Sequence, residues 1–342
     1  MRFGLGLIVL VMCLCAAELL VRYAVRAPAD EQYDARRDAY AWHPHASVLR
    51  TDEGYTRFRM DAHGFNNDPL PDPLPSKRVL VLGDSFVQSV QVMRSDNFIT
   101  RLNQRFAGQD VIVYNAGLAG GDPSYYPVLY DELDAAVQPQ YVVLCLSDND
   151  MTDLLRWAVK RDSEGRIVGF DRQNGMPSQF GLVRGWLYAH SALITHLKYR
   201  YDPVIRQWMR EKMMWFSGHQ ITRKHESNMD GVSDSLERWR FVLKYFLQRK
   251  LTITVVVMPV MENRARGSLQ LKYKGVDRLA EEARQMGIPV LDVNPTLLDD
   301  FRLSGLPAKG FNNTVPGVGH LNKRGHRLLG DWLASKFEVI TR

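Results

Sequence analysis

A run of apolar residues that leads directly into Gly-Asp-Ser is the feature that most constrains this chain. Residues 78–89 read RVLVLGDSFVQS. The apolar part predicts a buried strand with Ser85 at its carboxyl end. In open α/β sheets the ligand crevice lies outside the carboxyl ends of the strands, so this position suits a nucleophile. A serine that only caps the following helix would give the same short pattern, so the stretch alone assigns no role.

Strand-like and helix-like patterns alternate along the rest of the chain. Short apolar runs, rich in β-branched residues, occur at 110–114, 140–146, 252–258 and 288–293. Residues between them repeat their apolar positions with helical spacing, as βαβ units do. Five strands of this kind predict an α/β fold: a three-layer α/β/α sandwich with a mainly parallel five-stranded sheet, of flavodoxin-like type.

Four polar or small residues occur in a fixed order along the chain, each at a strand end or before a helix. Ser85 comes first, then Gly120, Asn149 and, near the C-terminus, His320. Here the chain resembles the SGNH, or GDSL-like, hydrolase family, whose name lists these four residue types. The resemblance covers roughly residue 61 to the C-terminus and leaves a long insert unmatched. It implies that Ser85 is the nucleophile, His320 the base, and Gly120 and Asn149 oxyanion donors.

The chemistry of these residues agrees with the resemblance. A serine hydroxyl becomes a good nucleophile when an imidazole takes its proton, and His320 is the candidate. Backbone N–H groups of Ser85 and Gly120 and the amide of Asn149 can hold the oxyanion of a tetrahedral intermediate. Loss of one such donor typically raises the barrier by about 2.7–4 kcal/mol.

Each of these residues also has an ordinary structural interpretation. Gly120 could be a turn glycine, Asn149 could close an Asx-turn, and the histidine could be a surface residue with His326 as a rival base. The ordered combination favours the catalytic interpretation. Asp84 and Asp150, which adjoin the serine and the asparagine, are expected to support the site.

One position departs from the family pattern. The family usually has an aspartate three residues before the histidine, and here that position is Gly317. Disabling the carboxylate of a serine protease triad lowers turnover about 10⁴-fold. The sequence leaves open what orients His320: Asp292, Asn312, Asn313 or a backbone carbonyl are candidates, and loss of catalysis is a further alternative.

The N-terminus carries a long apolar segment. Residues 3–21 are apolar except for Glu18, and 19 helical residues approach the ~20 that cross a bilayer. Glu18 precedes Arg22 by four residues, the favourable order for a helical ion pair. Residues 1–26 are therefore expected to form an uncleaved signal-anchor, with a cleaved signal peptide as the alternative. The basic N-terminus favours a single-pass protein of a bacterial inner membrane with its catalytic domain in the periplasm or outside the cell.

Residues 27–76 form a polar, turn-rich lead-in to the first core strand. It contains Asp61, Gly64 and Phe65 in the spacing D-x-x-G-F. This pattern resembles a stretch that precedes Gly-Asp-Ser in membrane-anchored bacterial members of the family, although Asn66 stands where arginine is common.

The hydrolase domain is expected to span residues 77–342 and to contain a helical insert at about 155–230. Between 155 and 225 the chain has 13 Lys and Arg against 5 Asp and Glu, and four of its seven Trp. A lid or docking face for an anionic polymer or a membrane would use such residues. Amphipathic helices with a solvated basic face would show the same composition.

Composition and residue spacing limit the kinds of partner and cofactor that the chain is expected to bind. The net charge of +6 comes without zinc-finger or RNP-type spacing, so no nucleic-acid partner is expected. The histidines of the insert lack a convincing ligand set, so neither a metal nor another cofactor is predicted. Cys145 is the one cysteine outside the apolar segment, so an internal disulfide cannot form.

Three functions remain. The first is a membrane-anchored serine esterase or O-acetyltransferase that acts on acetyl groups of an envelope or exported polysaccharide, or on a small ester, through an acyl-Ser85 intermediate. Hydrolysis and transfer share that intermediate, so the residues do not separate them. The second is a lipid esterase or thioesterase. The third, which Gly317 suggests, is a non-catalytic polysaccharide-binding factor of the envelope.

Overall fold

The computed structural model gives the fold of most of the chain. The residues that it describes are 2–25, 31–34, 39–50, 53–172, 229–264 and 268–341, together with isolated positions between 183 and 197. Most of the predicted insert lies outside these ranges.

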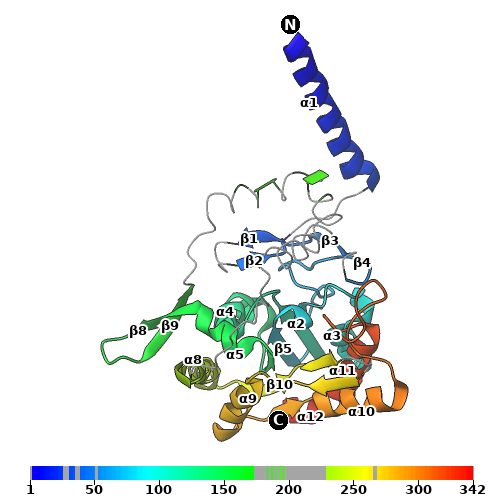
Figure 1. The fold of residues 1–342 in the computed structure, drawn as a ribbon. Coiled ribbons are helices and arrows are strands. Elements are labelled where there is room, and N and C mark those ends of the chain that lie inside the picture. The colour runs from blue at the N-terminus through cyan, green and yellow to red at the C-terminus, as the bar shows by residue number, and fades with distance from the viewer. Residues whose placement is uncertain are drawn as a thin grey trace, which may run out of the picture.

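A five-stranded parallel sheet forms the centre of the structure (Figure 1). Its strands lie in the order β13-β10-β7-β5-β6, and every neighbouring pair is parallel. The predicted sheet is thus confirmed. In chain order the strands are β5 (Lys77–Gly83), β6 (Val111–Gly117), β7 (Tyr141–Leu146), β10 (Thr252–Val257) and β13 (Val290–Asp292).

Helices cover both faces of this sheet, because alternate residues of the buried strands point to opposite sides. On one face Leu80 and Leu82 pack with apolar residues of α4 (Tyr126–Val137), α8 (Met229–Gln248) and α9 (Val276–Gln285). On the other, Val79 and Val81 pack with α3 (Phe98–Arg105), α10 (Asn294–Ser304), α11 (Lys323–Ser335) and α12 (Phe337–Ile340). The predicted α/β/α sandwich is the observed arrangement.

The start of the insert is a β-hairpin, where the sequence analysis expected helix. Strands β8 (Trp157–Arg161) and β9 (Ile167–Arg172) pair antiparallel. The turn explains the difference: the Asp162 carboxylate accepts the backbone N–H groups of Glu164 and Arg166, and Gly165 takes a left-handed φ of 77°. A second hairpin joins β11 (Met261–Arg264) and β12 (Ser268–Leu271). The helices expected farther along the insert lie outside the described residues.

The lead-in is folded onto the sheet domain. It contains the pair β1 (Gln32–Asp34) and β2 (Ala39–Ala41), and a hairpin of β3 (Ser47–Arg50) and β4 (Thr56–Arg59). Trp42, Val48 and Met60 form a small core with Val90, which follows Ser85 by five positions. Figure 1 shows these strands gathered beside α2 (Ser85–Gln88).

The D-x-x-G-F stretch is the anchor of this packing. The Asp61 carboxylate accepts the backbone N–H groups of His63 and Phe65, and it also accepts the Tyr114 hydroxyl of β6. The Asn67 side chain donates to Asp61 and to the Asn115 carbonyl, and accepts the Asn115 N–H at 2.7 Å. Because these groups are buried, the bonds tie the lead-in to β6 firmly.

The same contacts fix the helix that begins with Ser85. The Asn115 amide donates to the Val87 carbonyl at 2.7 Å, and the Asn66 amide donates to the Gln88 carbonyl at 3.0 Å. A Cβ at Gly117 would lie 2.1 Å from the Gln88 nitrogen, so the end of β6 must be glycine for α2 to approach it. The position of α2 therefore depends on β6 and on the lead-in.

The apolar segment at the N-terminus is helix α1 (Arg2–Leu20). Its window Gly6–Tyr23 has a mean hydropathy of 2.0 and is 6% buried, which makes it long and apolar enough to cross a membrane. At its end the predicted ion pair between Glu18 and Arg22 is present at 2.7 Å.

Asn67→Ala should destabilise the fold. It removes the acceptor for the Asn115 N–H and the donor for the Asn115 carbonyl, and leaves both buried groups without these bonds. We expect the free energy of unfolding to fall by about 1–3 kcal/mol in urea titrations, because unsatisfied buried groups carry that cost. The exposed Asn312→Ala is the matched control. Equal stability of the two variants would contradict the anchoring role.

Candidate active site

Ser85 lies where the sequence placed it, directly after β5, in the middle of the sheet. Strand β5 has β7 on one side and β6 on the other, and the carboxyl ends of all three meet at one edge. The Asp84 carboxylate caps α2 by accepting the Phe86 N–H at 2.9 Å. Ser85 is therefore held at a sharp strand-to-helix turn with its side chain at the ligand edge of the sheet.

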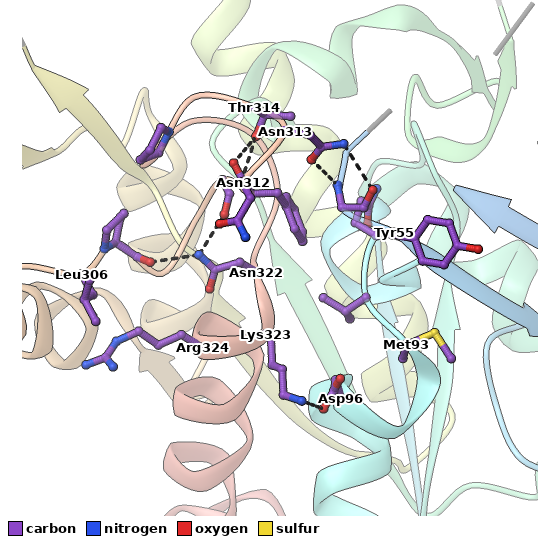
Figure 2. Close-up of a pocket in the computed structure, with 17 residues that line it drawn as sticks. Tyr55, Met93, Asp96, Leu306, Asn312, Asn313, Thr314, Asn322, Lys323 and Arg324 are labelled. Carbon is purple, nitrogen blue, oxygen red and sulfur yellow. Dashed lines mark hydrogen bonds and ion pairs between the residues drawn. The ribbon is translucent and has the colours of Figure 1, made fainter. Parts of the chain in front are cut away.

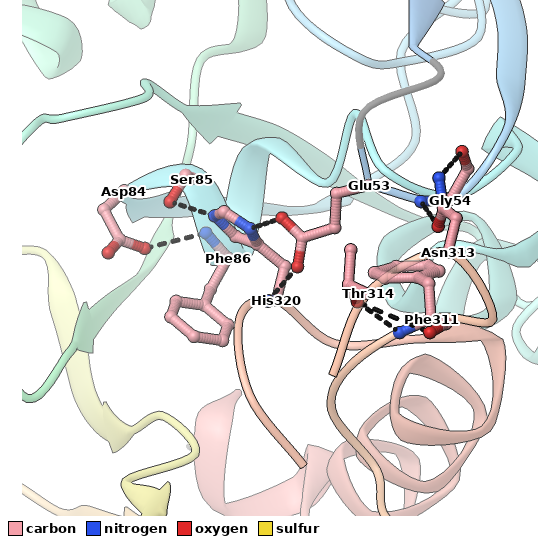
Figure 3. A network of polar contacts seen from close by, with 9 residues as sticks. All are labelled: Glu53, Gly54, Asp84, Ser85, Phe86, Phe311, Asn313, Thr314 and His320. Atoms are coloured by element: carbon pink, nitrogen blue, oxygen red, sulfur yellow. Dashed lines mark hydrogen bonds and ion pairs between the residues drawn. The ribbon is translucent and has the colours of Figure 1, made fainter. Parts of the chain in front are cut away.

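His320 meets Ser85 from the loop between α10 and α11. Its Nε2 atom lies 2.9 Å from Ser85 Oγ (Figure 3). The loop is pinned by an isolated bridge between Lys309 and Leu321 and by a bond of 2.9 Å from the Gly310 N–H to the His320 carbonyl. The structure thus brings together the two residues expected to be the nucleophile and the base.

A glutamate of the lead-in completes the arrangement. His320 Nδ1 lies 2.5 Å from Glu53 Oε2, and the His320 backbone N–H donates to Glu53 Oε1 at 2.7 Å. Ser85, His320 and Glu53 therefore form a continuous line of polar contacts, as Figure 3 shows. The sequence analysis did not name Glu53, which lies 267 positions from His320.

The turn that carries Glu53 is held by the loop that carries His320. The Gly54 N–H donates to Asn313 Oδ1 at 2.9 Å, and the Asn313 amide donates back to the Gly54 carbonyl at 3.3 Å. A Cβ at Gly319 would lie 2.1 Å from Glu53 Oε1, so glycine leaves the room that this carboxylate fills. Asn313, considered earlier as a partner of the imidazole, instead fixes the turn beside Glu53.

The other expected partner, Asp292, is engaged elsewhere. Its Oδ2 accepts the Tyr273 hydroxyl at 2.6 Å, and its Oδ1 accepts the Asn294 N–H at 2.9 Å. The carboxylate in contact with His320 is that of Glu53. Gly317, at the position of the usual aspartate, has a φ of 80°, a backbone conformation that favours glycine. Its N–H donates to the Lys309 carbonyl.

The electrostatics of Glu53 follow from these contacts. Burial by itself would raise the pKa of the Glu53 carboxyl, but the hydrogen bonds and charge of His320 and the nearby charge of Lys309 outweigh it and hold the pKa below its usual value of 4.5. The carboxylate is therefore ionised at neutral pH and can stabilise a positive charge on the imidazole.

Asp84 and Asp150 form a pair of buried carboxyls behind the serine. Asp150 accepts the Ser147 N–H at 2.7 Å, and the Asp84 side chain is also bonded to Ser147. Burial raises the pKa of both groups, and for Asp150 the neighbouring charge of Asp84 raises the pKa further. These carboxyls join the ends of β5 and β7 through Ser147, and their supporting role remains a prediction.

The two expected oxyanion residues follow β6 and β7, the strands on either side of β5. Gly120 lies in the exposed turn after β6, with a φ of 69°. Asn149 lies after β7, and its amide donates to Asp153 Oδ2 at 2.5 Å. A primary amide has two N–H donors, so this bond orients the Asn149 side chain and leaves one N–H for another acceptor. Their role as oxyanion donors remains a prediction.

His326, the rival base, is a core residue. It is 1% exposed and stacks on Phe98 with 5.9 Å between ring centroids. Burial lowers its pKa to about 3, so the ring is neutral at physiological pH.

Two hollows adjoin the His320 loop. The larger, of about 1080 Å³, has Tyr55 and Asn312 in its wall and an ion pair of 3.0 Å between Lys323 and Asp96, but neither Ser85 nor His320 (Figure 2). The smaller, of about 410 Å³, includes His320 itself. Because His320 lies in its wall and its size suits a small ligand, we regard it as the cavity that serves Ser85 and His320.

Within the described part of the chain, no three His, Cys, Asp or Glu side chains are grouped to hold a metal ion.

Similar solved structures are esterases and lipolytic proteins. No protein-family model and no curated protein matches the chain. Among solved structures, an acetyl xylan esterase, AlAXEase, shares 11% identity with a TM-score of 0.42 over 75% of this chain and 98% of its own. The esterase EstA from Pseudoalteromonas sp. shares 12% identity with a TM-score of 0.41, over 76% and 96% of the two chains.

A member of the lipolytic protein G-D-S-L family from Veillonella parvula DSM 2008 shares 12% identity with a TM-score of 0.37, over 78% of this chain and 100% of its own. The structural neighbours of the chain are thus SGNH/GDSL-like hydrolases, the family that its sequence motifs resemble. The chemistry of this chain is argued below from its own site.

Glu53→Gln should abolish most ester hydrolysis. The His320 backbone N–H is a fixed donor that will recruit the new amide oxygen, so the NH₂ group will face Nδ1 and impose the tautomer with a proton on Nε2. That tautomer cannot accept the serine proton, and we expect kcat to fall roughly 10³- to 10⁴-fold. The exposed Glu132→Gln on α4 is the control. Wild-type kcat in Glu53→Gln would refute the role of this carboxylate.

The lowered pKa of Glu53 also predicts an acid-dependent stability. The pKa of Glu53 in the folded state lies below 4.5, so between these two values the unfolded state binds more protons than the folded state. The bond to His320 therefore stabilises the fold above about pH 4.5, and this stabilisation is lost as the pH falls through the folded-state pKa. The difference in unfolding free energy between wild type and Glu53→Gln should therefore shrink on acidification. Urea titrations from about pH 6.5 to pH 3.5 measure it; a constant difference would contradict the assignment.

Proposed function

We propose that this chain is a serine esterase with a Ser85-His320-Glu53 triad. The observation that carries the proposal is the pair of contacts on one imidazole: 2.9 Å from Nε2 to Ser85 Oγ and 2.5 Å from Nδ1 to Glu53. A base in contact with a nucleophile and oriented by a third group is the arrangement that activates a serine.

In the acylation step, Ser85 Oγ attacks the ester carbonyl carbon while His320 Nε2 takes the hydroxyl proton. The imidazolium is stabilised by Glu53, and it then gives the proton to the leaving alkoxide as the carbon–oxygen bond breaks. The product is an acyl-Ser85 ester and a free alcohol. In the second step, water attacks the acyl ester with the same histidine as base, and releases the acid.

The negative charge of each tetrahedral intermediate requires fixed donors. The Ser85 N–H, at the first position of α2, has no acceptor within its own helix. The Gly120 N–H and the free amide proton of Asn149 come from the loops on either side. Together they supply three donors to the oxyanion.

We assign an acetyl ester of a polysaccharide as the substrate class. The cavity of about 410 Å³ that includes His320 has room for an acetylated sugar ring, and the larger hollow of about 1080 Å³ adjoins the same loop. An acetyl xylan esterase among the structural neighbours supports this class. Transfer of the acetyl group to a second sugar would use the same acyl-Ser85 intermediate with an alcohol in place of water.

We further propose that α1 anchors the protein in a bacterial inner membrane, with the catalytic domain outside the cytoplasm. Its large apolar side chains are exposed from Leu7 to Leu20, and Glu18 and Arg22 pair where the apolar run ends. An exported substrate would meet the domain on that side of the membrane.

Ser85→Ala and His320→Ala should each remove activity. For the full chain in detergent micelles, we expect p-nitrophenyl acetate turnover to fall roughly 10⁴-fold or more in either variant, because nucleophile and base act as one unit. Ser124→Ala, a buried serine away from the triad, is the control. Acetate release from acetylated xylan, followed in parallel, tests the substrate class. Wild-type turnover no faster than that of Ser85→Ala would rule out the esterase.

A further inference from the structure

One part of the insert is built around Ser191. Described positions between 183 and 187 and between 193 and 197 are helical, and Ser191 lies between the two groups. The Ser191 N–H donates to the Leu187 carbonyl at 2.8 Å, and its hydroxyl oxygen accepts the Ile194 N–H at 3.1 Å. Ser191 therefore ends one helical turn and caps the next, and the two turns meet at this residue.

Glu18 of α1 holds this junction. Glu18 Oε2 accepts the Ser191 hydroxyl at 2.8 Å and the Leu193 N–H at 3.0 Å, while Oε1 accepts the Arg22 guanidinium at 2.7 Å. One carboxylate thus joins the end of the apolar helix to a segment 173 positions farther along the chain. Figure 1 shows short green pieces of this segment near the end of α1.

The contact sets the depth of the segment relative to α1. Glu18 lies near the C-terminal end of the window Gly6–Tyr23, which is apolar enough to cross a bilayer. When α1 spans the membrane, Glu18 and Arg22 lie where the hydrocarbon gives way to the lipid headgroups. Groups within hydrogen-bonding distance of Glu18 lie at the same level, so the junction at Ser191 meets the bilayer surface.

The side chains on either side of the junction suit this surface. Val183 is 58% exposed, Trp186 59% and Leu197 44%. Residues 181–200 contain three Lys or Arg and no Asp or Glu. Exposed aliphatic and tryptophan side chains with basic neighbours are typical of segments that lie in the headgroup region of an anionic membrane.

We propose that the segment around Ser191 is a second membrane contact, in which Val183, Trp186 and Leu197 enter the headgroup region of the phospholipid bilayer beside α1. The inference rests on the proposed membrane anchor and extends it. The chain is attached through two elements, one that spans the bilayer and one that lies on its surface. Glu18 is the residue that positions the second element against the first.

Two exposed valines of the insert provide a matched test. Val183→Cys and Val168→Cys, the latter 56% exposed on β9, carry the same environment-sensitive fluorophore in full chains with Cys13→Ala and Cys15→Ala, and Cys145 is buried. The chains are reconstituted in vesicles of phosphatidylethanolamine and phosphatidylglycerol, with or without bromine on the acyl chains. Brominated lipid should lower the emission from position 183 by roughly half and leave that from position 168 nearly unchanged, because only position 183 lies at the interface.

Ser191→Ala tests how the segment is positioned. It removes the hydroxyl that donates to Glu18 and leaves the Leu193 N–H as the remaining bond to that carboxylate. With the label at position 183, we expect bromine quenching to fall roughly twofold. Ser335→Ala, which removes an exposed hydroxyl at the end of α11, is the control and should preserve the quenching.

Flotation of the vesicles separates this contact from the anchor. Chains that float with the vesicles but show equal quenching at positions 183 and 168 would overturn the surface contact while α1 stands as the anchor. Chains that do not float would overturn both. Quenching at position 183 that Ser191→Ala leaves unchanged would refute the positioning role of Glu18.

Discussion

The hydrogen bond between His320 Nδ1 and Glu53 is the interaction on which the rest of the site depends. It sets the orientation of the imidazole whose other nitrogen faces Ser85. Its acceptor comes from a hairpin turn, so the bond exists only if the hairpin is packed against the catalytic loop. Asn313 and Gly54 make that packing reciprocal, because each supplies both a donor and an acceptor to the other.

The lead-in therefore has two structural tasks. Through Asp61 and Asn67 it fastens onto β6, and through Asn66 it holds the end of the helix that begins with Ser85. Between these contacts and β3 lies the turn that supplies Glu53. A segment that is polar by composition is thus folded by buried hydrogen bonds rather than by a large apolar core of its own.

The sequence predicted what is encoded locally. Apolar runs of β-branched residues identify the strands, and the residues after the first strand identify Ser85. The pattern Gly-His before the last long helix identifies His320. Glu53 could not be found in this way. Its only local signal is an acidic residue before Gly54 in a turn between two short strands, and its partner lies 267 positions away. The β8–β9 hairpin was missed because its basic and aromatic residues suit an amphipathic helix as well as a twisted hairpin, and Gly165 alone marks the turn.

The position of Glu53 has a consequence for where the catalytic unit begins. Motifs delimit a domain from residue 77 onward, and that portion contains the entire central sheet together with Ser85 and His320. A chain shortened to those limits would retain Gly-Asp-Ser, Asn149 and His320 yet lack the carboxylate in contact with the His320 imidazole. The part of the chain that motifs delimit is therefore shorter than the part that makes the contacts among Ser85, His320 and Glu53, and the difference is the β3–β4 hairpin.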